Sequence, residues 1–332
     1  MGVTIKEVAL AAGVSAATVS RVLHDNSRIS DKTKEKVKEA MRQLNYVPNV
    51  AASSLAGKGP RTLGIVLPNN PDELFQNPFF INAMRGLSIY AQEHGYFLLY
   101  SFSQDELEEV NFIEKYLRSG WVSGVVLLTA REDDHCVSFL KENDFPFAMI
   151  GRPEEPGSTL WVDNDNFHAM YQVVNHLLDR GYRRIGFLGG PASFRVTKDR
   201  LMGYRQALMG RGLPIDESLI YQGQNFSIDQ GRIGGKVLLK TGVDALASTD
   251  DQLAFGAMEV VKEEGLENIG VTGFNNTSRG LYQSPSLTTV DVNADLLGSR
   301  AAELVISALE EKEDAPDHYI VETNLIVRDS SH

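Results

Sequence analysis

The stretch IKEVALAAGVSAATVSRV, residues 5–22, predicts two short helices joined by a tight turn. Its apolar residues recur at helical spacing, which indicates one buried face on each helix. Gly13 falls where the first helix must end in a left-handed residue, and Ser15 is placed to cap the second helix. Ala9 is small where the two helices would cross. This is the layout of a helix-turn-helix, whose second helix enters the major groove of DNA; the alternative is a plain helical hairpin.

The charge of the chain is divided unevenly along its length. The whole chain carries −12. Residues 1–61 hold ten Lys and Arg against five Asp and Glu and so carry +5, whereas residues 62–332 hold 22 against 39 and carry −17. A basic segment tethered to an acidic body is typical of a nucleic-acid-binding module. The distribution therefore favours DNA binding by the first 61 residues, because the acidic remainder would repel DNA.

The rest of the basic segment predicts a third helix and a conditional fourth one. Ser30 is placed to cap residues 31–44, whose Lys-rich face is either solvated or in contact with phosphates. In NYVPNVAASSLAGKGPRT, residues 45–62, Pro48 can begin a short helix. Such a short piece is unstable alone in water, but it could fold where two copies pair on DNA. Leu55 would then wedge into the minor groove; the alternative is a simple linker.

From Thr62 onward, short apolar runs alternate with amphipathic stretches. Strands are predicted at 63–68, 96–102, 124–129, 147–151, 184–190, 245–249 and 270–275. Helices are predicted at 79–94, 107–119, 134–142, 166–181, 198–211, 228–240, 251–264 and 294–311. Strands rich in Val, Ile and Leu that alternate with helices indicate parallel sheets covered on both faces. About 270 residues exceed one typical domain, so we expect two such sheets.

Polar and aromatic residues gather where the predicted strands end, which is where parallel sheets bind ligands. The candidates are Asn70, Phe79, Phe80, Trp161, Asp165, Arg200, Asp250 and Asn275. Carboxylate, amide and guanidinium groups form paired hydrogen bonds to neighbouring hydroxyls, and aromatic faces cover C–H patches, so the set favours a sugar. The alternative for Asp165 and Asp250 is that they only cap the helices that begin there.

Several classes of function are disfavoured by what the sequence lacks. The single cysteine, Cys136, excludes an intramolecular disulfide, and no apolar run is long enough to span a bilayer. The N-terminus has no secretory signal pattern, so we expect a cytoplasmic protein without a membrane partner. No Cys/His spacing predicts a metal, and GFLGG at 186–190 lacks the spacing of a dinucleotide loop. We therefore expect no cofactor, no metal and no catalytic residues, hence no enzyme.

The stretches TIKEVALAAGVSAATVSRVL (4–23) and LNYVPNVAASSLAGK (44–58) resemble the lactose-repressor (LacI/GalR) family of transcription regulators. The DNA-binding residues that this resemblance implies are Thr4, Ser15, Ala16, Ala17, Thr18, Ser20, Arg21, Asn49, Ala52 and Leu55. Among them Ala16, Ala17 and Arg21 match base-reading positions, and Leu55 matches the intercalating leucine of a hinge helix. Arg21 suits a guanine edge, whereas the two alanines offer no side-chain hydrogen bond, so part of the specificity would come from DNA shape.

The resemblance continues through the rest of the chain and implies an all-α helix-turn-helix head plus an α/β periplasmic-binding-protein-like body of two parallel-sheet lobes. The implied domains are a helix-turn-helix at 1–47, a hinge helix and linker at 48–61, and an effector-binding and dimerisation domain at 62–332. Its first lobe would take residues 62–160 and 290–322, and its second lobe residues 163–288 and 323–332. The positions that match effector contacts of the family are Asp165, Arg200, Phe226, Asp250 and Asn275. The family usually places Asp at the position of Asn275 and often Asn at that of Asp250, so this chain exchanges the two residue types.

Within the family, NPFF (77–80), VDNDN (162–166) and VTKDRLMGY (196–204) resemble the maltose-operon repressors of Gram-positive bacteria. This implies a homodimeric repressor of a palindromic operator, with maltose or a malto-oligosaccharide as its effector. The expected effect of the sugar is induction, although one branch of the family uses corepressors. The alternative is a catabolite-control regulator with a phosphorylated carrier protein or another sugar as co-effector. A sugar-cleaving enzyme would need a carboxylate pair across the scissile bond, and an extracellular transport component would lack the head.

Overall fold

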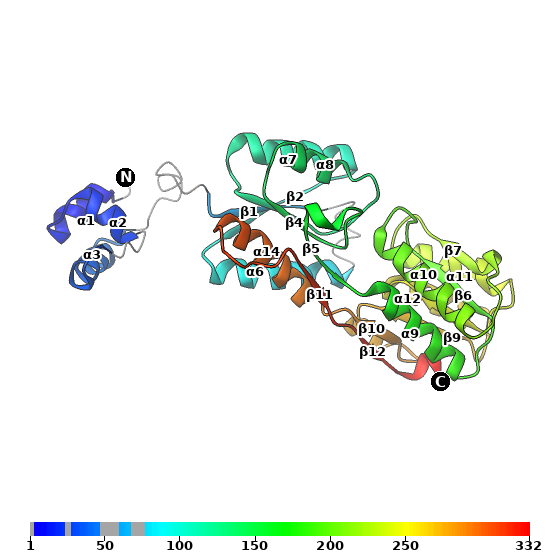
Figure 1. Ribbon diagram of the computed structural model, residues 1–332. Coiled ribbons are helices and arrows are strands. Elements are labelled where there is room, and N and C mark those ends of the chain that lie inside the picture. The colour runs from blue at the N-terminus through cyan, green and yellow to red at the C-terminus, as the bar shows by residue number, and fades with distance from the viewer. Residues whose placement is uncertain (1–2, 24–27, 47–59, 68–76) are drawn as a thin grey trace. The chain divides into compact units, whose positions relative to one another are not determined.

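The computed structural model describes residues 3–23, 28–46, 60–67 and 77–332 (Figure 1). The chain divides into two compact units, Met1–Arg61 and Thr62–His332, which we call the head and the body. In the described segments, no helix combines the length and the apolar composition that crossing a membrane requires.

The described part of the head is all α-helical. Its helices are α1 (Ile5–Ala12), α2 (Ala16–Leu23) and α3 (Asp31–Gln43). Val8, Val19 and Val37, one from each helix, are fully buried at the centre of a small core. Helices of this length are marginal in isolation, so their mutual packing supplies most of their stability.

The turn between α1 and α2 confirms the two end signals that the sequence predicts. Gly13 ends α1 with a φ of 65°, in the left-handed region. Ser15 caps α2, because its Oγ accepts a hydrogen bond from the backbone N–H of Thr18 at 3.1 Å. The T-x-x-E signature of a capping box also stands at the start of α1: the carboxylate of Glu7 accepts from the backbone N–H of Thr4 at 2.7 Å, and Thr4 Oγ1 accepts from that of Glu7 at 3.4 Å.

The body contains two sheets of six strands each. Each sheet forms one lobe together with its helices. In the first lobe the strand order is β11-β5-β4-β3-β1-β2, all parallel. Its strands are β1 (Thr62–Leu67), β2 (Phe97–Phe102), β3 (Gly124–Leu127), β4 (Phe147–Ile150), β5 (Leu160–Asn164) and β11 (His318–Val321). Its helices are α6 (Pro78–Glu93), α7 (Glu106–Ser119), α8 (His135–Glu142) and α14 (Ala294–Leu309), with a 3-10 turn, η2 (Pro156–Ser158).

In the second lobe the strand order is β12-β10-β9-β8-β6-β7, parallel except that β12 runs antiparallel to β10. Its strands are β6 (Ile185–Gly189), β7 (Ile220–Gln222), β8 (Ala245–Ser248), β9 (Gly270–Phe274), β10 (Thr288–Asp291) and β12 (Asn324–Ile326). Its helices are α9 (Asn166–Asp179), α10 (Arg195–Gly210), α11 (Ile228–Leu239), α12 (Asp251–Glu263) and α13 (Ser278–Leu281), with two 3-10 turns, η3 (Glu217–Leu219) and η4 (Asp329–Ser331). The predicted fold class, a helical head and two parallel-sheet lobes, is therefore confirmed.

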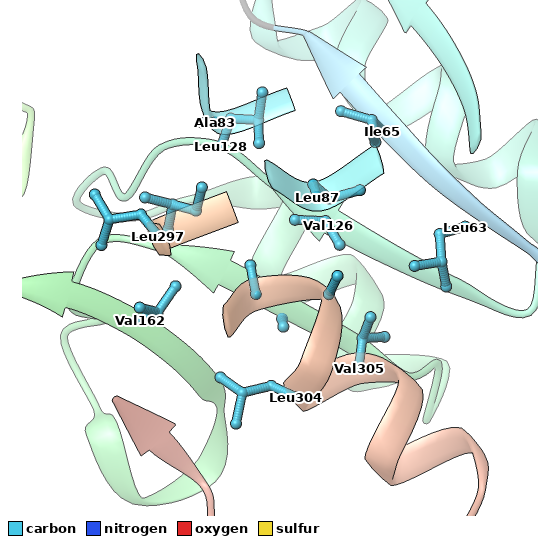
Figure 2. Packing of buried hydrophobic residues seen from close by; sticks show 14 of the residues in the cluster. Leu63, Ile65, Ala83, Leu87, Val126, Leu128, Val162, Leu297, Leu304 and Val305 are labelled. Atoms are coloured by element: carbon cyan, nitrogen blue, oxygen red, sulfur yellow. The ribbon is translucent and has the colours of Figure 1, made fainter. Parts of the chain in front are cut away.

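The core of the first lobe explains why its strands are apolar without alternation. Figure 2 shows Leu63, Ile65, Val126 and Val162 of the strands against side chains of α6 and α14. A second buried cluster, which includes Ile113 of α7, covers the other face of the same sheet. A parallel sheet buried on both faces needs apolar side chains pointing both ways.

The chain crosses between the lobes three times: after β5, after β10, and between β11 and β12. Asn164, at the end of β5, joins these crossings. Its Nδ2 donates to the carbonyl oxygen of Val292 at 3.1 Å and to that of Val321 at 2.9 Å. One buried amide therefore holds three neighbouring backbones together where the lobes meet.

All seven predicted strands and all eight predicted body helices are present, but five strands were not predicted. Three of them, β7, β11 and β12, have three or four residues and partly exposed side chains, so they carry little apolar periodicity. Strand β5 (Leu160–Asn164) was also not predicted. Its polar end, Asp163 and Asn164, is buried by hydrogen bonds rather than by apolar packing.

Helices α6 and α14 cross at two glycines. A Cβ on Gly298 would overlap the carbonyl oxygen of Ala83, and a Cβ on Gly86 would overlap that of Asp295. Only residues without a side chain allow the two backbones to approach this closely.

We expect Gly298→Ala to lower the free energy of unfolding of the first lobe by about 1–3 kcal/mol, because the added methyl group forces the two helices apart. Urea unfolding followed by tryptophan fluorescence measures this, since both tryptophans, Trp121 and Trp161, lie in the first lobe. Gly157→Ala is the control, because a Cβ there meets nothing within 4 Å. Equal stabilities of the two variants would contradict the account of this crossing.

Candidate functional site

A cavity is lined by both lobes of the body. Its lining comes from the ends of parallel strands and the starts of the helices that follow them. The predicted effector residues that line it are Phe79, Phe80, Arg200, Phe226, Asp250 and Asn275.

Asp250 lies at the centre of a set of hydrogen-bond donors. It is the N-cap of α12, because its Oδ1 accepts from the N–H of Gln252 at 2.7 Å. Its Oδ2 accepts from Asn77 Nδ2 at 3.1 Å and from Asn275 Nδ2 at 2.8 Å. Asn77 belongs to the first lobe, so this carboxylate joins the two lobes. Asp250 therefore both caps α12 and lines the cavity, so the two roles that the sequence left open are combined in one residue.

Asn275 is placed by an unusual backbone. It follows β9 with a φ of 101°, in the region that asparagine tolerates better than most residues. Its backbone N–H donates to the carbonyl oxygen of Val290 at 2.8 Å. The exchange of Asp and Asn between positions 250 and 275 thus leaves an acid and an amide in direct contact, with the acid at the helix start.

Arg200, on α10, is buried in the wall of the cavity. Its Nε and one terminal nitrogen donate to Asn166 Oδ1 at 3.0 and 2.8 Å, and its other terminal nitrogen donates to the carbonyl oxygen of Thr249. The guanidinium also lies 3.9 Å from the ring centre of Phe274. These contacts fix its plane before any ligand arrives, and N–H groups remain for an oxygen ligand because guanidinium has five.

Asn166 is in turn held by Asp163, whose Oδ1 accepts from Asn166 Nδ2 at 2.8 Å. Asp163 Oδ2 accepts from the backbone N–H of Arg152 at 2.9 Å. Burial raises the pKa of Asp163 to about 6. A chain of hydrogen bonds therefore runs from Asp163 of β5 through Asn166 of α9 to Arg200 of α10.

The cavity wall and the adjacent Asp251 bring several ionisable groups together out of water. Burial raises the pKa of Asp250 to about 7, and the neighbouring carboxylate of Asp251 adds to the rise. Burial also raises the pKa of Asp251 to about 6, opposed by its hydrogen bonds with Thr289 and Thr277. Burial lowers the pKa of Arg200 to about 10, while Asp250 opposes the change. Buried carboxylates thus outnumber the guanidinium that they surround.

Two pairs of aromatic rings complete the lining. Phe79 and Phe80, at the start of α6, have ring centres 5.3 Å apart and planes at 78°. Phe194 and Phe226, from the second lobe, have ring centres 5.8 Å apart and planes at 89°. Each lobe thus contributes an edge-to-face pair to a cavity whose other lining residues include acids, amides, one guanidinium and several aliphatic side chains.

Three predicted effector residues are not part of this lining. Asp165 is exposed and caps α9 by accepting from the N–H of His168 at 2.9 Å, which is the alternative that the sequence left open. Trp161 is buried in the first lobe, where it stacks on His318 with ring centres 4.7 Å apart. Asn70 lies outside the described residues.

Most lining residues were not among the predicted contacts, and they include Asn77, Asp163, Asn166 and Phe194. One of them has a signal in the sequence, since Asn77 precedes a proline at a helix start, as a cap does. Asp163 lies in β5, which was not predicted. The sequence does not show that Asn77 and Asp163 face one cavity, because that depends on how the two lobes meet.

In the head, α2 has a buried and an exposed face. Val19 and Val22 are buried, whereas Ala17 and Arg21, four residues apart, are exposed on the same face. Ala16, Thr18 and Ser20 are partly buried, and Thr4 and Ser15 are exposed helix caps. Asn49, Ala52 and Leu55 lie outside the described residues. The exposed face of α2 therefore has the short neutral residue and the cation that the prediction assigns to base contact.

Comparison with known proteins agrees with this architecture. Residues 4–49 match the model of bacterial regulatory proteins of the lacI family, and residues 174–331 match that of a periplasmic binding protein-like domain. The HTH-type transcriptional regulator MalR of Streptococcus pneumoniae is 37% identical over 95% of each chain. The HTH-type transcriptional regulator CelR of Thermobifida fusca is 32% identical over 98% of each chain. A solved structure described as a transcriptional regulator CelR-cellobiose complex has a TM-score of 0.77 at 30% identity and covers 99% of both chains.

A helix-turn-helix head and a two-lobed body with a ligand cavity define a DNA-binding transcription regulator. The chain belongs to the lacI family of bacterial regulatory proteins. Members of this family regulate transcription and are not enzymes, so family membership confirms the expectation that the chain is not one.

The buried carboxyl of Asp250 predicts a particular dependence of stability on pH. In the unfolded chain it ionises near 3.8, whereas in the folded chain its pKa is about 7. Between these values the folded state binds the extra proton, so the free energy of unfolding falls as the pH rises. We expect Asp250→Asn to make this fall shallower by about 1.4 kcal/mol per pH unit.

Urea unfolding between pH 4.5 and 7.5, followed by circular dichroism, measures the slope. Asp163 and Asp251 remain in the variant, so part of the slope persists. Asp165→Asn is the matched control, because this residue is exposed and asparagine preserves the helix cap. Identical slopes for Asp250→Asn and the unchanged chain would contradict the assignment.

Proposed function

We propose that this chain is a transcriptional repressor whose affinity for operator DNA is controlled by a small sugar, with maltose or a malto-oligosaccharide as inducer. The observation that carries the proposal is the wall of the cavity in the body. It combines Asp250, Asn275 and Arg200 with two pairs of phenylalanine rings.

The chemistry of this wall suits a polyhydroxylated ligand. Asp250 offers only acceptor oxygens when ionised, Arg200 offers only donors, and Asn275 offers both. A sugar ring presents hydroxyls that both donate and accept, so adjacent hydroxyls satisfy an acid and a guanidinium at once. The rings of Phe79 and Phe226 supply apolar surface for the C–H faces of the sugar. The polar groups are already oriented by the protein, which lowers the entropy lost on binding.

The choice of maltose rests on relatives and on local sequence. The MalR regulator is 37% identical over nearly the whole chain, and NPFF (77–80) places two rings in the cavity. The CelR regulator, at 32%, supports the wider class of glucose disaccharides, because its solved relative is a cellobiose complex. Maltose and cellobiose both consist of two glucose units and differ in the stereochemistry of the bond between them.

The remaining parts of the proposal follow from DNA recognition. Two heads are needed to read the two halves of a palindromic operator, so the chain acts as a homodimer. The head is basic and the body acidic, which leaves the head as the part that docks on DNA. A repressor of this kind works in the cytoplasm, where the operator is.

We expect the full chain to bind maltose or maltotriose and to release operator DNA when it does so. Calorimetry against maltose, maltotriose, cellobiose and glucose measures the first step. A gel shift on a palindromic duplex, selected by the chain itself from random sequences, measures the second. A coupling of ~1–3 kcal/mol would weaken the DNA complex roughly 5- to 150-fold.

The outcomes separate the parts of this proposal. If only cellobiose bound, cellobiose would replace maltose as the proposed effector. If sugar strengthened the DNA complex, the sugar would be a corepressor. If none of the four sugars bound, the cavity would not be a site for glucose oligosaccharides. Asp250→Asn should lower sugar affinity, since it removes a carboxylate from the wall, whereas Asp165→Asn should leave affinity unchanged.

We expect Arg21→Ala to weaken binding to the selected duplex by ~1–3 kcal/mol and to relax specificity at one base pair, because a guanidinium makes two hydrogen bonds to guanine. Arg21 is exposed on α2, so its loss leaves the core of the head intact. Arg118→Ala in the body removes the same charge from an exposed site and is the control. A loss of affinity that is equal for all duplex sequences would assign Arg21 to phosphate contact instead.

A further inference from the structure

Two segments from different lobes pair beside the cavity. Arg131, beyond the end of β3 in the first lobe, forms an isolated antiparallel bridge with Phe194, just before α10 in the second lobe. We call segments 130–132 and 193–195 the clasp. Neither segment belongs to a sheet, and no crossing of the chain between the lobes connects them. Their pairing is therefore a separate, non-covalent link between the lobes.

The clasp is held by backbone hydrogen bonds. The N–H of Glu132 donates to the carbonyl oxygen of Ser193 at 3.1 Å, and the N–H of Arg195 donates to that of Ala130 at 3.1 Å. Neutral backbone bonds of this kind contribute little net free energy each. A link of two such bonds can open and reclose without unfolding either lobe.

Side chains reinforce the clasp from both ends. Lys198 of α10 forms an ion pair with Glu132, and both side chains are partly exposed. The Arg131 guanidinium lies 5.6 Å from the ring centre of Phe194. The same guanidinium is anchored in the first lobe by two hydrogen bonds to the carboxylate of Glu109, at 2.9 and 2.8 Å. The first-lobe segment is therefore rigidly mounted, whereas the Lys198–Glu132 pair is accessible to solvent and salt.

The clasp also forms part of the cavity wall. Ala130 and Phe194 both line the cavity, and Phe194 packs edge-to-face on the lining residue Phe226. Opening the clasp would therefore move an aromatic wall of the cavity away from the first lobe.

We infer that the clasp is a closure device that sets how long a ligand stays in the cavity. The inference rests on the proposed sugar-binding function. A ligand enters when the clasp is open and is retained while the clasp is closed. Glu132, Lys198 and the Arg195 N–H act as positioning groups, since none of them lines the cavity. Weakening the clasp should raise the dissociation rate of the sugar and leave its association rate nearly unchanged.

The substitution Arg195→Pro in the full chain tests this inference, because it removes a single backbone N–H group of the clasp. Arg195 is the first residue of α10, a position that proline fits, and Phe194 before it has the extended backbone (φ −80°, ψ 130°) that a following proline requires. Proline removes the N–H that bonds to Ala130. Arg195→Ala is the matched control, because it removes the same side chain, including its pair with Asp199, and keeps the N–H.

Two readouts are compared. The first is hydrogen exchange at the amide of Glu132 in sugar-free protein, which should be faster in Arg195→Pro than in Arg195→Ala. The second is release of tritiated maltose into excess unlabelled maltose, which should be about fivefold faster in the proline variant, the ratio that one backbone hydrogen bond provides. Lys198→Met should speed release about twofold at low salt only, since partly exposed pairs are weak and screened, and Lys198→Arg should restore slow release.

Each outcome decides a different point. Unchanged exchange at Glu132 would show that the two segments do not act as one unit and would overturn the inference. Faster exchange with unchanged sugar release would also overturn it, because the clasp would not control the cavity. If the unchanged chain bound no maltose, the proposed effector would fail, and release of whichever sugar the calorimetry identified would replace the second readout.

Discussion

The hydrogen bonds of Asn164 are the constraint on which the body depends. This amide joins the three crossings of the chain by donating to Val292 and Val321, and it lies beside the cavity that both lobes line. A residue that ends β5 thus holds the three crossings together at one junction, around which the clasp can open and close. An amide suits this position because its two N–H groups bond to two carbonyl oxygens without burying a charge.

Around this junction, the cavity wall and the adjacent Asp251 place more carboxylates than cations out of water. Asp163, Asp250 and Asp251 all have a pKa raised by burial, and Arg200 is held among them. Burying such groups is costly unless they are hydrogen-bonded, and each of these carboxylates accepts at least two hydrogen bonds. The arrangement gives up stability for a rigid set of acceptors and donors, as functional sites often do.

Much of the fold could be predicted from the sequence because its signals are local. The turn at Gly13, the cap at Ser15 and the alternation of apolar strands with amphipathic helices each depend on a few neighbouring residues. The short strands β7 and β12 could not be predicted, since their pairing partners rather than their own residues make them strands.

The candidate site was predictable in part for a related reason. Residues at strand ends, such as Arg200, Asp250 and Asn275, could be selected because parallel strands all end at one edge of a sheet. The contact between Asn77 and Asp250 could not, because it joins residues 173 positions apart in different lobes. Trp161 shows the converse: it was selected as a residue beyond the end of a predicted strand, but pairing with β4 and β11 makes it part of a strand in the core.

The return of α14 and β11 to the first lobe has a consequence for how the protein is made. Strands β1–β5 leave the ribosome early, but α14, which shares one face of their sheet with α6, and β11, which completes its edge, are finished only at Val321. At ~5–20 residues per second, the interval from Asn164 to Val321 lasts roughly 10–30 s. During that time the second lobe is synthesised while the first remains an open sheet with a partly uncovered apolar face. The nascent first lobe is therefore the part of the body that needs protection from aggregation.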